Sequence, residues 1–176
     1  MCRSRLRNGK SPIQNPRRRI IIESPTSTRL HSGTNHRAVN IMSRRSRARE
    51  VVLQLLYQDD LNPDRKLSRD DDFIRIRLHG NEELCAFAKS LLSGVRRNRG
   101  ELDEMLSQRA DNWSLERMAA TDRNVLRLGA YEIQYAETPP RVAINEAVDL
   151  AKRFGAKQSA QFVNGVLDRF LHDTQD

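Results

Sequence analysis

The chain has 176 residues and a formal net charge of +8. This length fits one domain or two small packed subdomains, and the charge favours a polyanionic partner. Nine of the 31 Lys and Arg residues, but only one of the 23 acids, lie in residues 1–41, so residues 42–176 carry 22 of each and are neutral. Any nucleic-acid site within residues 42–176 must therefore be a local basic patch.

Two bulk features point to a cytoplasmic protein with no membrane partner. No run of about eighteen apolar residues occurs, so we predict no membrane span. The two cysteines, Cys2 in a polar stretch and Cys85 in an apolar helical pattern, favour free thiols in a reducing compartment.

Residues 1–41 are predicted to be a disordered basic extension, because they are rich in Arg, Ser, Asn and Pro and have no apolar periodicity. The extension could be an arm that adds nonspecific RNA affinity, or an organelle transit peptide. It could also result from a start codon placed too early, so that it is not translated in the native protein. We favour the last explanation, because Met42 directly precedes a plausible helix cap at Ser43.

From Ser43 onward the apolar residues follow a helical period. A first helix ends near Asn62-Pro63, and one face of it carries Ala48, Val51, Val52, Leu55 and Leu56. After a charged connector, Asp64 to Asp72, a weak second helix with Phe73 and Ile76 on its apolar face is closed by His79-Gly80. Asn81 caps the clearest helix, whose apolar stripe is Leu84, Phe87, Ala88, Leu91, Leu92 and Val95.

The second half of the chain continues the helical pattern. Gly100 separates the third helix from a short fourth one, and the fifth, striped from Leu126 to Ile133, ends at Thr138-Pro139-Pro140. The sixth is predicted to end at Gly155 as a left-handed cap, and the seventh runs from about Lys157 to Leu171. The sequence thus predicts an all-α fold of about seven helices in two packed subdomains, residues 42–99 and 100–176.

The last helix has an apolar arc with a polar flank. Val163 and Phe170 are at the centre of the arc and Phe162 at its margin, beside a flank that carries Gln158, Gly165 and Arg169. An aromatic ring next to an amide suits stacking and edge recognition of an unpaired base, and the helix start near Lys157 offers N–H groups to a phosphate. Spacing alone also allows Phe162 to be an ordinary core residue.

An arginine cluster precedes the first apolar helix residues and comprises Arg44, Arg45, Arg47 and Arg49. Cations are unfavourable in the first turn of a helix, so a cluster without an acid before Glu50 suggests a phosphate partner, although a solvated helix end is the alternative. Catalytic patterns are missing: the four histidines are scattered, and no Gly-rich phosphate loop or metal-ligand spacing occurs. We expect no enzymatic activity, cofactor or metal, and we assign Arg127, Glu132 and Glu146 to structural polar contacts.

Three segments together resemble the NusB family of bacterial transcription antitermination factors: RRSRAREVVLQLLYQ, TDRNVLRLGAYEI and VAINEAVDLAKRFGAKQSAQFVNGVLD. The resemblance spans residues 42 to about 172. It implies a helical, non-enzymatic protein that pairs with NusE, a small ribosomal-subunit protein. The pair binds single-stranded boxA RNA in ribosomal RNA leader transcripts, joins the RNA polymerase antitermination complex and aids ribosomal RNA maturation.

The resemblance also implies which residues contact RNA. The arginine-rich N-terminus of the family corresponds to Arg44, Arg45, Arg47 and Arg49, although Ser46 interrupts a run that is often continuous, and the RNA-contacting last helix corresponds to Gln158 and Phe162. Two other classes stay open. One is a protein–protein adaptor that does not bind RNA itself. The other is the NusB-like accessory domain of a ribosomal RNA methyltransferase, which would require a catalytic domain beyond Asp176.

Overall fold

The computed structural model describes residues 35–109 and 114–173, with side chains from residue 44 onward. The described residues form seven α-helices and two short 3-10 helices, Leu67–Arg69 and Leu115–Arg117, and no strand. The α-helices are α1 (Asn35–Leu61), α2 (Asp70–Arg77), α3 (Glu82–Arg97), α4 (Arg99–Ser107), α5 (Ala120–Tyr135), α6 (Pro140–Phe154) and α7 (Ser159–Asp173). The predicted all-α class with about seven helices is confirmed. None of the described helices is long and apolar enough to span a bilayer.

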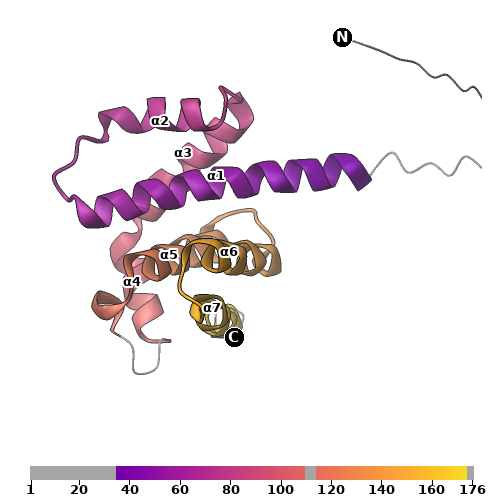
Figure 1. Cartoon of the computed structure of the whole chain (residues 1–176). Coiled ribbons are helices and arrows are strands. Elements are labelled where there is room, and N and C mark those ends of the chain that lie inside the picture. Colours follow the sequence, from indigo (N-terminus) through magenta and orange to yellow (C-terminus); the bar gives the residue numbers. More distant parts are fainter. Residues whose placement is uncertain (1–34, 110–113, 174–176) are drawn as a thin grey trace, which may run out of the picture. The chain divides into compact units, whose positions relative to one another are not determined.

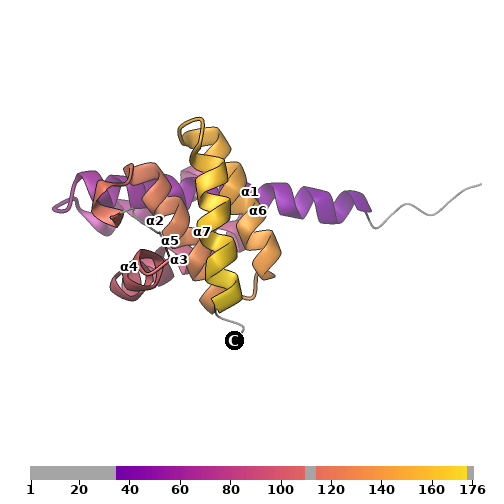
Figure 2. The ribbon, with the colours of Figure 1, turned by 90° about the horizontal axis from the view of Figure 1, so that it is seen from below.

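Helix α5 is the centre of the packing, because it contacts α1, α3, α4, α6 and α7. Helix α1 packs against α3 as well as α5 (Figure 1), and α7 lies across α5 and α6 (Figure 2). At Gly129 of α5 a Cβ atom would lie 2.6 Å from the side chain of Leu167, so α7 can approach this closely only because the position is glycine.

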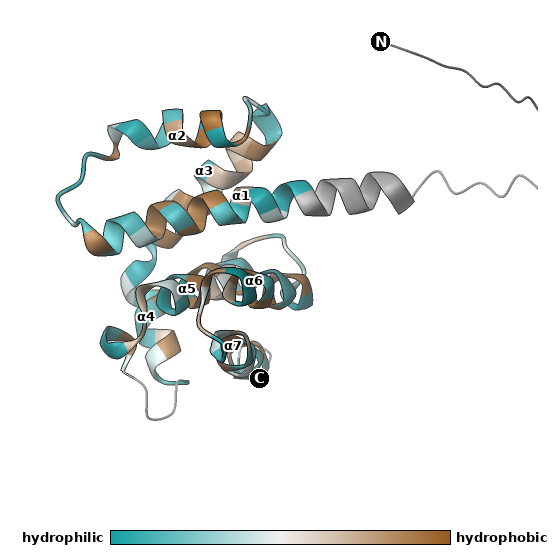
Figure 3. Ribbon diagram, in the orientation of Figure 1, coloured by the Kyte–Doolittle hydropathy of each residue, from teal (hydrophilic) through white to brown (hydrophobic). Residues whose placement is uncertain are grey.

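The apolar periodicity correctly identifies most of the core. All five apolar residues predicted for the first helix are buried, and in the third helix only Phe87 of the predicted stripe is partly exposed. Helix α1 is hydrophilic around residues 44–50 and hydrophobic in its middle (Figure 3). The predicted cap is also confirmed, because the Asn81 side chain accepts a hydrogen bond from the Leu84 N–H at 3.0 Å.

The predicted start of the first helix is wrong. Helix α1 begins at Asn35, so Ser43 lies inside the helix and is not its cap. Residues 35–41 are therefore helical and do not belong to a disordered extension, while residues 1–34 lie outside the described part of the chain. The arginine cluster is consequently not in the first turn, and the helix-dipole argument for a phosphate partner fails.

Three smaller predictions also need correction. In α2, Phe73 packs against the core as predicted, but Ile76 is 70% exposed and the buried isoleucine is Ile74. The break between α3 and α4 is at Asn98, and Gly100 lies within α4. The backbone at Gly155 is extended, with φ of −90°, so this residue is not a left-handed cap. The division into subdomains at residues 99 and 100 stays a prediction.

Candidate RNA-binding surface

The four arginines of α1 lie in different environments although they share less than two helical turns. Arg44 and Arg45 are exposed, Arg47 is partly exposed, and Arg49 is only 3% exposed. The cluster is therefore not a uniform basic surface.

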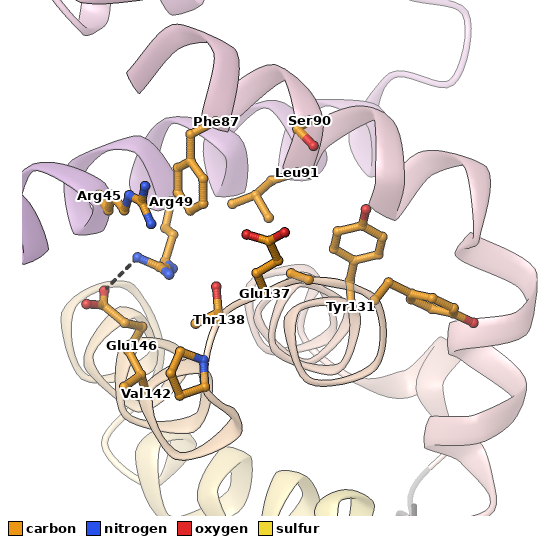
Figure 4. A pocket seen from close by; sticks show the side chains of 13 residues that line it. Arg45, Arg49, Phe87, Ser90, Leu91, Tyr131, Glu137, Thr138, Val142 and Glu146 are labelled. Carbon is orange, nitrogen blue, oxygen red and sulfur yellow. Dashed lines mark ion pairs between the residues drawn. The ribbon is translucent and has the colours of Figure 1, made fainter. Parts of the chain in front are cut away.

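Arg45 is held by α3. Its guanidinium lies 5.1 Å from the centre of the Phe87 ring and pairs with Glu83 at 3.3 Å. Arg45 and Phe87 line a hollow of about 640 Å³ between α1, α3 and the α5–α6 turn (Figure 4). The ion pair with Glu83 is solvent-exposed, so it contributes little to stability, and the Arg45 side chain stays accessible to a phosphate.

Arg47 pairs within its own helix. Its Nη1 atom lies 2.5 Å from Oε2 of Glu50, three residues further along α1. The Arg47 side chain is 43% exposed whereas that of Glu50 is 8% exposed, so a largely buried carboxylate fixes a partly exposed guanidinium. This arrangement restricts the side chain without removing it from solvent.

Arg49 does not fit its predicted role as a phosphate contact. Its guanidinium donates two hydrogen bonds to Glu132 of α5, at 2.8 and 2.6 Å, and lies 3.7 Å from Glu146 of α6 (Figure 4). Glu132 is 1% exposed, so the pair is a buried link between α1 and α5. Although Arg49 lines the hollow, only 3% of its side chain is exposed, which leaves almost no surface for a phosphate, and we correct its assignment to a structural one.

The start of α7 carries the second group of predicted RNA contacts. Lys157 and Gln158 are exposed and directly precede the helix, which begins at Ser159, two residues later than predicted. The Ser159 hydroxyl accepts a hydrogen bond from the Ala156 N–H and donates one to Asp122, each at 2.8 Å. The turn that presents Lys157 and Gln158 is thereby fixed to α5.

Phe162 occupies the predicted margin of the apolar arc. Its ring is partly buried and packs against the core, whereas neighbouring Val163 is fully buried. Gln158 and Phe162 line the same hollow of about 500 Å³, together with Met118 and Asp122. The structure thus brings the amide and the ring together, while their contact with RNA stays a prediction.

The sequence analysis did not predict which acids pair with the arginines of α1, although the structural role that it assigned to Glu132 is confirmed. Glu50 was detectable, because it follows Arg47 at the i+3 spacing of helical ion pairs. Glu83 and Glu132 had no such signal, since 38 residues separate Glu83 from Arg45 and 83 residues separate Glu132 from Arg49.

The structural role predicted for Arg127 is confirmed. Arg127 lies 2.6 Å from Asp103 and 3.1 Å from Asp60, and Asp60 also pairs with Arg123 at 2.7 Å. Desolvation of the Asp60 carboxyl raises its pKa, but the hydrogen bond from Arg123 and the charges of its arginine neighbours outweigh this and lower the pKa below 3.8. Asp60 therefore stays ionised and joins α1 to α5.

The candidate site comprises exposed cations on α1 and, at the start of α7, a lysine, an amide and a partly exposed ring. No cluster of metal-ligating side chains occurs among the described residues. These features define the class as a helical protein equipped for nucleic-acid binding.

Comparisons with known proteins give the particular family. The family model described as NusB matches residues 46–172, and the chain belongs to the NusB family. It is 44% identical over 130 residues to the transcription antitermination protein NusB of Anaeromyxobacter dehalogenans, which covers 72% of this chain and 89% of the relative.

Two solved structures are similar to the fold. The structure of T. maritima NusB has a TM-score of 0.66 and 32% identity and covers 73% of this chain and 91% of that one. A complex of the antitermination factors NusB and NusE with double-stranded RNA contains a chain with a TM-score of 0.64 and 26% identity, and the match covers 75% of this chain and 98% of that one.

Proposed function

We propose that this protein is a transcription antitermination factor that binds boxA-type single-stranded RNA of ribosomal RNA leader transcripts together with NusE. In this role it promotes processive transcription by RNA polymerase and ribosomal RNA maturation. It acts in the cytoplasm by binding and not by catalysis. The NusB relatives carry this activity in their name, and one similar structure is a complex with NusE and RNA.

The observation that carries the proposal is the shared hollow of Gln158 and Phe162. A partly exposed ring offers a stacking face, and an adjacent amide offers both a donor and acceptors for a base edge. Arg44, Arg45 and Arg47 supply phosphate contacts from α1, and Lys157 supplies one at the start of α7. Phosphate contacts fix the position of the RNA, while the ring and the amide select the base.

The test is a gel shift of the full chain, with and without NusE, on a boxA-like RNA and on a scrambled RNA of the same length. We expect tighter binding to the boxA-like RNA, strengthened further by NusE. Gln158→Ala should reduce this preference, whereas Asn164→Ala should not, because Asn164 is an exposed amide that donates to Asp168 on the same helix. Equal affinity for both RNAs in the presence of NusE would overturn the proposal, and an RNA affinity of NusE that this protein leaves unchanged would support the adaptor alternative.

A further inference from the structure

Arg153 is a cation in the last turn of α6 that faces another helix. Its Nη1 atom pairs with Oε1 of Glu50 in α1, and its guanidinium lies 5.3 Å from the centre of the Phe154 ring. A cation near a helix C-terminus is favourable in itself, but this does not explain why the side chain crosses to α1. The adjacent Lys152 follows the ordinary pattern, because it pairs within α6 with Asp149 at 2.9 Å.

One carboxylate therefore holds two guanidiniums from different helices. Glu50 accepts from Arg47 at one oxygen and from Arg153 at the other. Its side chain is only 8% exposed, whereas those of Arg47 and Arg153 are 43% and 61% exposed. Each guanidinium has five N–H donors, so donors are left over on both, and the three side chains together carry a charge of +1.

The position of this cluster connects the two predicted RNA-binding elements. Arg47 belongs to the arginine cluster of α1, and Arg153 precedes Lys157 by four residues on the α6–α7 turn. A fully extended chain of that length spans about 14 Å, so the Cα atoms of Arg153 and Lys157 lie no further apart than that.

We propose that Arg47 and Arg153, held side by side by Glu50, form a phosphate clamp for the RNA backbone between the arginines of α1 and the base-recognition hollow of α7. The inference rests on the proposed function, since it extends the same RNA path. Planar guanidiniums suit this role, because they bind phosphate oxygens through paired N–H groups and lose less side-chain freedom when they are already fixed. Glu50 is a positioning residue here and contacts no RNA.

The chain offers a matched control for Arg153. Lys152 is its neighbour on the same helix, carries the same charge and is 62% exposed, but it pairs with Asp149 on its own helix. Arg153→Ala and Lys152→Ala therefore remove equal charge at nearly equal exposure. Only the first variant removes a member of the clamp.

The experiment measures the affinity of the full chain with NusE for the boxA-like RNA at several salt concentrations. Arg153→Ala should weaken binding about five- to tenfold at low salt, and the slope of log affinity against log salt should fall by about 0.7, the value for one phosphate contact to a single strand. Arg153→Lys should retain the salt slope. The double variant Arg47→Ala with Arg153→Ala should lose about 1.4 units of slope, the value for two phosphate contacts. A purely structural Arg153 would lower the melting temperature and leave the salt slope unchanged.

The outcomes separate this inference from the proposed function. If wild type and Arg47→Ala behave as expected but Arg153→Ala matches Lys152→Ala in affinity and slope, the clamp is wrong and the function stands. If the wild-type chain with NusE does not bind the boxA-like RNA, the proposed function itself fails.

Discussion

Replacing Arg49 with Ala should destabilise the fold far more than replacing Arg47, although the two are neighbours in one cluster. Arg49→Ala removes both hydrogen bonds to Glu132. Among the described residues, this 1% exposed carboxylate then keeps only the hydrogen bond from the Thr138 hydroxyl, at 2.9 Å. Removing one partner of a buried ion pair costs about 3–5 kcal/mol. Arg47→Ala breaks a partly exposed pair, for which about 1 kcal/mol or less is expected.

These losses of unfolding free energy are measured by urea unfolding and by thermal unfolding, both monitored by circular dichroism. At about 2–4 °C per kcal/mol for a chain of this size, Arg49→Ala should lower the melting temperature by roughly 6–20 °C. Arg47→Ala is the control, and its main effect should be on RNA affinity. A double variant, Arg49→Met with Glu132→Leu, should recover much of the loss, because it removes the unpaired charge as well as the pair.

The reasoning is refuted if Arg49→Ala melts within 2 °C (roughly 0.5–1 kcal/mol) of wild type while its RNA affinity falls as far as that of Arg47→Ala. That result would return Arg49 to the set of phosphate contacts predicted from the sequence.

Three further predictions test other parts of the molecule. Phe162→Ala should cost about 1–3 kcal/mol of RNA binding free energy and little folding stability. Val163→Ala, at a fully buried position, should lower the stability and leave the RNA affinity of the folded protein unchanged. A Phe162→Ala variant that unfolds while its folded fraction binds RNA normally would contradict this. Asp60→Asn should lower the urea midpoint at pH 7. The difference from wild type should start to shrink as the pH falls to about 3.8 and should disappear only below the lowered pKa of folded Asp60, because the stability that this carboxylate contributes is lost as it is protonated in the folded state. Deleting residues 1–41, which carry the whole net charge, removes only the first seven residues of α1. The deletion should flatten the salt dependence of RNA binding but preserve base discrimination, and a loss of helical circular dichroism much larger than these seven residues account for would refute this.

The sequence predicts the helices well because their signals are local. The 3.6-residue period places Val51, Val52, Leu55 and Leu56 on the buried face of α1, and they are buried. The start of α1 was misplaced because Ser43 has the side chain of a helix cap. However, the stretch from Asn35 to Ser43 contains no Gly or Pro that would interrupt a helix, so the helix continues through it.

The burial of Arg49 could have been predicted from the sequence. Val52, Leu53 and Leu56 follow Arg49 at i+3, i+4 and i+7, and all three are buried, so spacing alone places Arg49 against the core. Its partner could not have been predicted, because no local sequence pattern identifies Glu132 as the carboxylate that pairs with Arg49. A long-range ion pair follows from how α1 and α5 pack, and the periodicity of one helix carries no information about this.

The acids that meet each arginine therefore decide how much of the cluster acts on RNA. Counting charges in the sequence predicts four phosphate contacts in α1, whereas we propose three, because Glu132 holds Arg49 in the core. The geometry then adds Arg153 from α6, which no basic run in the sequence marks, because Glu50 holds it beside Arg47. Salt dependence measures phosphate contacts and not formal charge, so it should fall for Arg44, Arg45, Arg47 and Arg153 variants and not for Arg49 variants. The RNA path is thus set by packing between helices that are far apart in the chain.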